Sequence, residues 1–454
     1  MNGDFSSFGI KVPEILLPNP TVDLHKWAVV ACDQYTSQPE YWDEVARFVG
    51  SDPSTYHLIY PEVFLGRDDE AERIRRIHHK MRSYLEEQIL VSPGSGFIYL
   101  ERQTAGPIAR KGLMVTLDLE CYDYKPGSQT FVRATEGTVL DRIPPRVRIR
   151  EGAPLESPHI MVLIDDPDFQ VIEPLEKAKA QYPKLYETPL MMKGGKVAGY
   201  FINRPADMAQ IYQGLSFLAE QAHFEAKYGV TNTAVLLFAV GDGNHSLATA
   251  KAVWEKMKEK AGRNRAVLSH PARYALVELV NIHDRALQFE PIHRVMFHVE
   301  LEELTVAMGQ YFGNDHFRLT RFSNGEDLFE RMRSIQERNA PTREESHVIG
   351  YCSGSENGIL QIGHPRFNLE VGSLQAFIDQ YVKTHPHTSV DYIHGEQVVA
   401  ELGGKPGNIG FYLPVMSKQA LFQTVIVDGV LPRKTFSLGE AEEKRFYLEC
   451  RKIS

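Results

Sequence analysis

Cysteine is scarce in this chain, which has four cysteines in 454 residues. They are Cys32, Cys121, Cys352 and Cys450, and no two of them form a Cys-x-x-Cys pair. This spacing argues against a zinc ribbon, a thioredoxin-type redox site and a disulfide scaffold. The cytoplasm, a reducing compartment, is therefore the expected location.

Long apolar runs and basic runs are missing as well. No stretch approaches the roughly 20 apolar residues of a membrane-spanning helix, and residues 1–20 lack the basic and apolar regions of an export signal. The formal net charge is −9, which disfavours a surface for nucleic acid or anionic membranes. We expect small-molecule partners, no nucleic acid and no membrane; the oligomeric state stays open.

The composition, with 43% apolar and 24% charged residues, is that of a globular protein with sizeable cores. Strand and helix patterns alternate over residues 1–300, which predicts a main α/β (or α+β) domain with a mixed-sheet core. Helices at 301–312, 326–338 and 374–383, with a hairpin around 353–358, predict a smaller α+β unit. This unit is expected over 301–454, and its tail could pack back on the main domain.

The most informative stretch is an apolar strand, predicted at 233–240, that runs through a glycine-rich turn into a helix. The turn reads Gly241-Asp242-Gly243-Asn244-His245-Ser246, and the apolar spacing is helical from Leu247 onward. Glycine permits backbone conformations that side chains forbid, and a helix N-terminus offers unpaired N–H groups. The turn can therefore hold a phosphate or a carboxylate. In the alternative interpretation, Asp242 or Asn244 only caps the helix and His245 is a surface residue.

A second candidate region combines carboxylate and guanidinium groups. It contains Glu136, Arg142 and Arg146. A glutamate there could act as a general base while the arginines bind phosphate, which is the division of labour in phosphoryl transfer. The alternative is a solvated hairpin with surface ion pairs. Asp33 is a further candidate, because it stands where an early strand should end.

Seventeen histidines invite a search for a metal site, but the sequence has no His-Glu-x-x-His motif. The His-x-His sequence at 385–387 lies in a polar loop without a nearby carboxylate, which makes it a poor metal site. His293 and Arg294 could be a buried structural pair or could contact substrate. His394 has the same two interpretations, and Lys434 could reach into the site.

Several dispersed motifs resemble the bacterial and archaeal domain of unknown function 1015 family, in the order of that family. The resemblance covers nearly the whole chain. Because the family is largely uncharacterised, it implies no particular reaction. The matching residues are Cys32-Asp33-Gln34-Tyr35, Glu136 and Thr138 with Asp141-Arg142, Asp242-Gly243-Asn244-His245, Asn281–Asp284 with Pro291-Ile292-His293-Arg294, Asp391-Tyr392-Ile393-His394, and Leu431-Pro432-Arg433-Lys434-Thr435.

More distantly, the Asp-Gly-x-His loop that opens a helix is similar to the phosphate-binding loop of the ParB and sulfiredoxin-like fold, which includes nucleotide-dependent free-serine kinases. The resemblance implies that the backbone and side chains of 243–246 cradle phosphate. It also implies that Asp242 holds Mg²⁺ or orients the loop, and that Glu136 is the base.

Two positions depart from that pattern. Ser246 stands where an arginine is usual, and Thr135 stands where many relatives have histidine. Both changes remove cationic or titratable groups, so the charge of a bound phosphate would have to be neutralised by other side chains. The candidates are Arg142, Arg146, Lys251 and Arg294.

Together these features predict a Mg²⁺-dependent phosphotransferase that uses ADP or ATP as phosphoryl donor and acts on a small hydroxylated metabolite such as serine. Glu136 or Asp33 would take the hydroxyl proton. A phosphomonoester hydrolase and a non-catalytic nucleotide or metabolite sensor remain alternatives. The predicted catalytic residues are Glu136, Asp33 and His245, and the predicted phosphate-binding residues are Gly241, Asp242, Gly243, Asn244, His245, Ser246, Arg142, Arg146 and Arg294.

Overall fold

The chain forms two compact units in the computed structural model, which describes residues 3–104, 106–137, 143–322, 328–339, 346–439 and 441–454. Unit 1 comprises Met1–Gln288 together with Leu438–Ser454, and unit 2 comprises Phe289–Ser437. The final segment of the chain therefore returns to unit 1. The smaller unit was expected from residue 301, whereas the preceding strand, β15 (Phe289–Phe297), already belongs to the sheet of unit 2.

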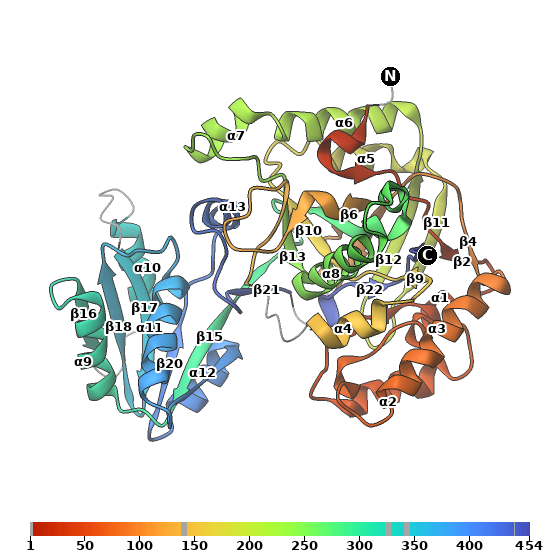
Figure 1. Cartoon of the computed structure of the whole chain (residues 1–454). Helices are drawn as coiled ribbons and strands as arrows, with labels where there is room; N and C mark the ends of the chain where they lie inside the picture. Colours follow the sequence, from red (N-terminus) through yellow and green to blue (C-terminus); the bar gives the residue numbers. More distant parts are fainter. Residues whose placement is uncertain (1–2, 105, 138–142, 323–327, 340–345, 440) are drawn as a thin grey trace. The chain divides into compact units, whose positions relative to one another are not determined.

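Unit 1 is built on a large mixed sheet (Figure 1) with the order β11-β12-β5-β6-β14-β10-β13-β8-β7, and with β1 beside β6. β10 is parallel to β14, and both β13 and β7 are parallel to β8. The predicted α/β class with a mixed-sheet core is thus confirmed. The bounds are β1 (Ile10–Lys11), β5 (Phe97–Gln103), β6 (Arg110–Asp118), β7 (Tyr122–Asp123), β8 (Val132–Ala134), β10 (Met161–Ile164), β11 (Lys184–Pro189), β12 (Lys196–Ile202), β13 (Phe238–Asp242) and β14 (Tyr274–Asn281).

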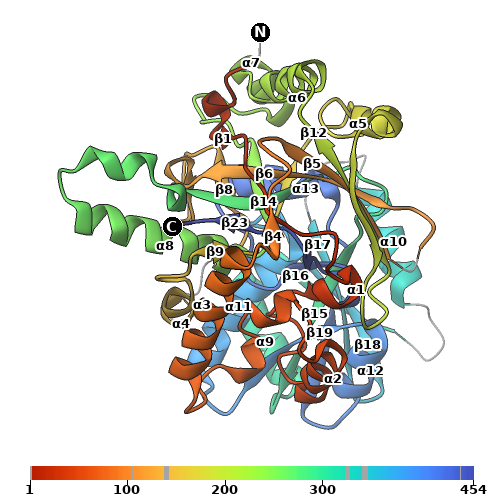
Figure 2. The same ribbon diagram turned by 90° about the vertical axis from the view of Figure 1, so that its right-hand side faces the viewer.

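The helices of unit 1 include one from the arginine-rich region, α4, for which a hairpin was the alternative interpretation. Pro144 and Pro145 lie in its first turn, where a missing N–H costs little. α4 lies beside α3 and contacts α8 (Figure 2). The carbonyl oxygen of its Ile149 accepts a hydrogen bond from His78 of α3 at 2.8 Å. The bounds are α1 (Leu24–Trp27), α2 (Pro39–Val49), α3 (Glu70–Glu86), α4 (Ile143–Arg150), α5 (Glu173–Ala178), α6 (Pro205–Leu218), α7 (Gln221–Tyr228) and α8 (Asn244–Ala261).

The C-terminal segment of the chain completes an apolar core formed by the first hundred residues. β22 (Phe446–Tyr447) pairs with β3 (Val29–Val30). The indole nitrogen of Trp27, which is fully buried, donates a hydrogen bond to the carbonyl oxygen of Leu448 at 2.9 Å. The short strands β2 (Leu17–Pro18) with β4 (Leu90–Val91), and β9 (Leu155–Glu156) with β23 (Arg451–Lys452), close the same part of unit 1.

Unit 2 is a smaller α+β unit, as the sequence predicted, and its sheet has the order β16-β18-β17-β20-β15-β19. The predicted hairpin is the antiparallel pair β17 and β18. Over the described residues, no helix of the chain has both the length and the apolar character needed to cross a membrane. The bounds are β15 (Phe289–Phe297), β16 (Phe317–Phe322), β17 (Ser346–Ser353), β18 (Glu356–Gly363), β19 (Ser389–His394) and β20 (Asn408–Tyr412), with α9 (Leu301–Phe312), α10 (Leu328–Asn339), α11 (Glu370–Thr384), α12 (Glu396–Gly403) and α13 (Lys418–Val427).

Candidate anion-binding site

The junction between β13 and α8 is a single left-handed residue, Gly243, with a φ of 77° and no side chain capping the helix. A Cβ atom on Gly243 would lie 3.0 Å from the Cα of Ile160, so glycine is required for both conformation and space. Gly241 is also close-packed, since a Cβ there would lie 2.8 Å from Cγ of Leu163. Both glycines are therefore required by close packing within the protein at the start of α8.

Asn244, the first residue of α8, is held by the neighbouring strand. Its Nδ2 donates to Oγ1 of Thr135 at 3.5 Å, and Thr135 donates to the carbonyl oxygen of Val240 at 2.6 Å. The Oδ1 atom of Asn244 is buried, and no described residue gives it a hydrogen bond. Because buried polar atoms are normally satisfied, this oxygen is available to a ligand that donates a hydrogen bond. Thr135, which replaces the expected histidine, serves to position the loop.

Ser246 is the first residue in a series of polar contacts within unit 1. Its Oγ lies 3.3 Å from Nε2 of His159, and Nδ1 of the same imidazole lies 2.8 Å from the hydroxyl of Tyr447. The Tyr447 oxygen already accepts the backbone N–H of Cys32 at 3.1 Å, so its own O–H can donate to Nδ1. Nε2 of His159 thus faces Ser246 on the side of the imidazole opposite to Tyr447.

The carboxylates of Asp242 and Asp33 and the ammonium group of Lys444 lie beside these polar contacts. Nζ of Lys444 is 3.2 Å from Oδ2 of Asp242, and Oδ2 of Asp33 is 3.7 Å from Nε2 of His159. Burial disfavours the charged form of Asp33. The charge of His159, a hydrogen bond from Gln34 at 3.0 Å and the charge of Lys444 nevertheless hold the pKa of its carboxyl below the usual value. Asp33 is therefore ionised at neutral pH.

Asp242 was predicted to hold Mg²⁺ or to orient the loop, and both of its oxygens have partners within the protein. Oδ1 accepts the N–H of Gly243 at 2.8 Å, and Oδ2 pairs with Lys444. Across the part of the chain that the structure describes, no group of at least three His, Cys, Asp and Glu side chains is arranged to hold a metal ion. The donor set does not fit a preformed metal centre, and an ammonium group stands where the cation was expected.

The other predicted residues of unit 1 are distributed around the same edge of the sheet. Ala134 pairs in parallel with Val240, so Glu136, two residues beyond Ala134, lies at the strand ends together with Asp242. His245 is the second residue of α8 and is half-buried. Arg146 of α4 forms an ion pair with Glu62, whose pKa is raised because burial outweighs the charge of Arg146.

Two further cations proposed from the sequence, Lys251 and Arg294, have other described partners. Arg142 lies outside the described residues. Lys251 donates to the carbonyl oxygen of Leu119 at 2.7 Å and pairs with Glu255 at 2.8 Å. Arg294 belongs to unit 2 and is fully buried, with its Nε donating to Oε1 of Gln375 at 2.9 Å.

The remaining candidates from the sequence also belong to unit 2. His293 is buried and its Nδ1 accepts the backbone N–H of Leu413 at 3.1 Å, which favours the structural interpretation of this residue. His394 and Lys434 are exposed.

A partly open pocket of about 150 Å³ lies next to the start of α8, and all of its lining residues belong to unit 1. Ser246, His159 and Tyr447 form one part of its wall, and the ion pair of Glu62 with Arg146 forms another. Apolar side chains complete the lining; they include Leu58, Met81, Ile149 and Leu155. The cavity can hold a small molecule beside the loop.

Sequence reasoning missed three of these residues, His159, Tyr447 and Lys444. His159 precedes a buried strand, and Lys444 follows an acidic run that favours a solvated position. No local pattern distinguishes them, because their roles depend on contacts between segments far apart in the chain.

Solved structures of low similarity were found over much of the chain. Free serine kinase in complex with AMP has a TM-score of 0.37 and 9% identity, covering 75% of this chain and 92% of that one. A conserved hypothetical protein from Pyrococcus furiosus has a TM-score of 0.33 and 9% identity, covering 74% and 90%. SbnI with a C-terminal truncation, from Staphylococcus aureus, has a TM-score of 0.31 and 11% identity, covering 74% and 82%. Similarity at this level establishes no shared activity.

Among curated proteins, none matches the sequence. The family model described as protein of unknown function (DUF1015) matches residues 16–381. That range contains Asp33, Glu136, His159 and the loop at 241–246, whereas Lys444 lies beyond it. As the dispersed motifs predicted, the chain belongs to the DUF1015 family of proteins of unknown function.

Proposed function

We propose that this chain binds a nucleotide through its phosphates at the start of α8 and transfers a phosphoryl group to the hydroxyl of a small metabolite. The observation that carries the proposal is the uncapped N-terminus of α8 with Lys444 and His159 beside it. The N–H groups and the positive end of the helix dipole favour an anion there.

In this proposal, Lys444 and His159 provide the polar hydrogens and positive charge of the arginine that is usual at the position of Ser246. Lys444 offsets the charges of Asp242 and Asp33, which would otherwise repel a phosphate. Nε2–H of His159 and the hydroxyl of Ser246 are polar hydrogens at the helix start. The unsatisfied Oδ1 of Asn244 suits a donor such as a hydroxyl of the ligand.

Asp33 is the preferred base in this proposal. It is held ionised and lies beside His159, which lines the cavity where the acceptor would be bound. The acceptor hydroxyl gives its proton to the carboxylate of Asp33 while its oxygen forms a bond to the transferred phosphorus. The bond between that phosphorus and the nucleotide oxygen breaks, and its electron pair leaves with the nucleotide. Glu136, at the same strand ends, is the second candidate.

The size of the cavity favours a small acceptor. Its volume of about 150 Å³ is below that of pockets for drug-sized ligands, which are roughly 300–1,000 Å³. An amino acid of the size of serine is the first acceptor to test. We also propose a cytoplasmic location, because the four cysteines are free thiols.

The test is calorimetric titration of the full chain with ADP and ATP in the presence of Mg²⁺, beside the variant His245→Ala. His387→Ala, which changes an exposed histidine of unit 2, is the control. Binding by the wild type and the control, lost in His245→Ala, supports the site. Retained binding in His245→Ala rejects it.

Turnover assays then separate the reaction classes. Transfer to serine or another hydroxyl acceptor supports the phosphotransferase, and the variant Asp33→Asn should reduce kcat with little change in nucleotide affinity. Phosphate release from a phosphomonoester without any nucleotide would instead indicate a hydrolase. Nucleotide binding without turnover, unchanged in Asp33→Asn and Glu136→Gln, would indicate a sensor.

A further inference from the structure

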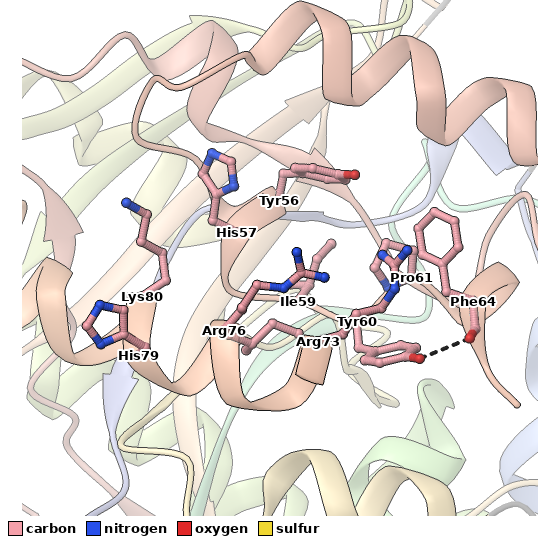
Figure 3. A pocket seen from close by; sticks show the side chains of 11 residues that line it. Tyr56, His57, Ile59, Tyr60, Pro61, Phe64, Arg73, Arg76, His79 and Lys80 are labelled. Carbon is pink, nitrogen blue, oxygen red and sulfur yellow. Dashed lines mark hydrogen bonds between the residues drawn. The ribbon is translucent and has the colours of Figure 1, made fainter. Parts of the chain in front are cut away.

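A second pocket of unit 1, with a volume of about 410 Å³, lies between α3 and the segment 56–64 (Figure 3). The short helix η2 (Thr55–His57) begins one residue before this segment, and the short helix η3 (Glu62–Phe64) ends it. Neither the α8 loop nor its polar neighbours line this pocket. The two pockets share Ile59 and Tyr60 in their linings but have different charged residues.

One wall of the pocket carries positive charge from a single helix face. Arg73, Arg76 and Lys80 of α3 line it, and their spacing of three and four residues places them on one side of the helix. His79 adds an imidazole. Among the described residues, no aspartate or glutamate lines the pocket.

These charges are only partly neutralised by neighbouring carboxylates. Arg73 pairs with Asp69 at 2.6 Å. The distance from Arg76 to Glu72 is 3.9 Å and both side chains are 62% exposed, so this pair contributes little. Within the described ranges Lys80 is in no salt bridge. Positive charge therefore remains available to an anionic ligand.

The opposite wall is apolar and partly aromatic, with Ile59, Pro61 and Phe64 buried and Tyr56 half-buried. The hydroxyl of Tyr60 donates to the carbonyl oxygen of Phe64 at 2.9 Å, which fixes this part of the segment (Figure 3). The guanidinium of Arg73 lies 4.3 Å from the ring centroid of Phe64, so it joins the two walls.

The cations of α3 also act on titratable groups of the opposite wall. Burial raises the pKa of the Tyr56 hydroxyl, and the charges of Arg73 and Arg76 oppose this rise. Burial lowers the pKa of His57, and the charge of Lys80 lowers it further. The positive charges of Arg76 and Lys80 on α3 are therefore felt by side chains of the segment 56–64.

We infer that this pocket binds a small phosphorylated metabolite, with its phosphate at Arg76 and Lys80 and its carbon skeleton against Ile59, Pro61 and Tyr56. A guanidinium and an ammonium match the oxygens of a phosphate, the first by two parallel hydrogen bonds and the second as a point charge. The volume is much larger than a phosphate ion and falls within the range for small organic ligands, roughly 300–1,000 Å³. An organic phosphate therefore fits better than the free ion.

The test uses AMP, ribose 5-phosphate and inorganic phosphate as probes on the full chain. Affinity is measured by calorimetry, and the bound region is located by hydrogen–deuterium exchange. The variant is Arg76→Gln combined with Lys80→Gln. The control is Arg75→Gln combined with Arg82→Gln, which removes equal charge from exposed positions of α3 that do not line the pocket.

We expect AMP or ribose 5-phosphate to protect residues 56–64 and α3 from exchange, with inorganic phosphate binding at least tenfold more weakly. The pocket variant should lose at least tenfold in affinity together with this protection, while the control matches the wild type. Protection confined to the start of α8 would overturn the inference without affecting the proposed function. Equal affinity in the pocket variant and the control, or no protection of α3 by any probe, would also overturn it.

Discussion

The ammonium of Lys444 lies 3.2 Å from the carboxylate of Asp242, so the C-terminal segment supplies a cation to the loop that opens α8. Only 11% of the Lys444 side chain and 25% of the Asp242 side chain are exposed, which limits screening by solvent and salt. Lys444 also acts on Asp33. One lysine therefore balances two carboxylates where a ligand would add further negative charge.

Replacing Lys444 with methionine should weaken nucleotide binding at least tenfold, which corresponds to about 1.4 kcal/mol. The physical reason is that Asp33 and Asp242 would then face the phosphates without a counter-charge. The measurement is calorimetric titration with ADP and ATP. Lys452→Met, at an exposed position of the same segment, should bind as the wild type does. Wild-type affinity in Lys444→Met would show that this lysine is not part of a nucleotide site.

Gly243→Ala should destabilise the protein more than Gly229→Ala. Both glycines are left-handed, with φ of 77° and 65°, and a side chain in this conformation costs about 1–2 kcal/mol. A Cβ at Gly243 would also lie 3.0 Å from the backbone of Ile160, whereas at Gly229 nothing lies within 4 Å. Thermal unfolding measures the difference.

The same pair separates binding from stability. Gly243→Ala should lose nucleotide binding because the start of α8 must shift, and Gly229→Ala, at the C-terminal end of α7, should keep it. Equal melting temperatures and equal affinities in the two variants would contradict the close packing at this loop.

Arg445→Met should lower the free energy of unfolding by about 3–5 kcal/mol. The guanidinium pairs with the fully buried Glu278 at 2.5 Å and also with Glu449, so its removal leaves buried carboxylates with less compensation. Arg110, which is 3.2 Å from Glu278, offsets part of the loss. Urea unfolding measures the effect, with Lys452→Met as the control. A loss as small as that of a surface ion pair, below about 1 kcal/mol, would contradict the assigned burial.

Unit 2 should lose stability as the pH falls below neutrality. His293 and His347 are 2% and 6% exposed, and burial lowers the pKa of each imidazole from its usual value of 6.5 to about 4. Between these pH values the unfolded chain binds protons that the folded chain does not, so stability is complete above pH 6.5 and is lost as the pH falls toward 4. At pH 5 the loss should be about 2 kcal/mol for each histidine.

The variant His347→Gln tests this assignment, because it removes one of the two titrating groups. Its nitrogen partner is the hydroxyl of Ser373 at 3.0 Å, which an amide can also bond. Urea unfolding followed by circular dichroism at pH 7 and pH 5 should show a smaller loss in the variant than in the wild type. Equal losses would mean that His347 is protonated in the folded chain.

The loop at 241–246 could be predicted because its signal is local: a buried strand ends at a glycine pair and helical spacing begins at once. Asp33 was found for a similar reason, since it follows β3. The α/β class followed from the alternation of strand and helix patterns. Each of these features can be recognised from residues that are neighbours in the sequence.

The remainder of the candidate site depends on pairing between distant segments. Lys444 follows acidic neighbours, which favours solvent exposure, yet it is buried because the final segment crosses unit 1. His159 is positioned by Tyr447. Arg294 has a guanidinium group, as many phosphate-binding residues do, but inside unit 2 this group donates a hydrogen bond to Gln375. Periodicity and spacing carry no information about such partners.

The return of Leu438–Ser454 to unit 1 has a consequence for the order of biosynthesis. A ribosome releases the β13–α8 loop long before it releases Lys444 and Tyr447, and unit 2 emerges in between. Until the segment Leu438–Ser454 has been synthesised, Trp27 lacks its hydrogen-bond partner Leu448 and Glu278 lacks its ion-pair partner Arg445. The polar contacts beside the start of α8 are therefore complete only after Lys444 and Tyr447 have been synthesised.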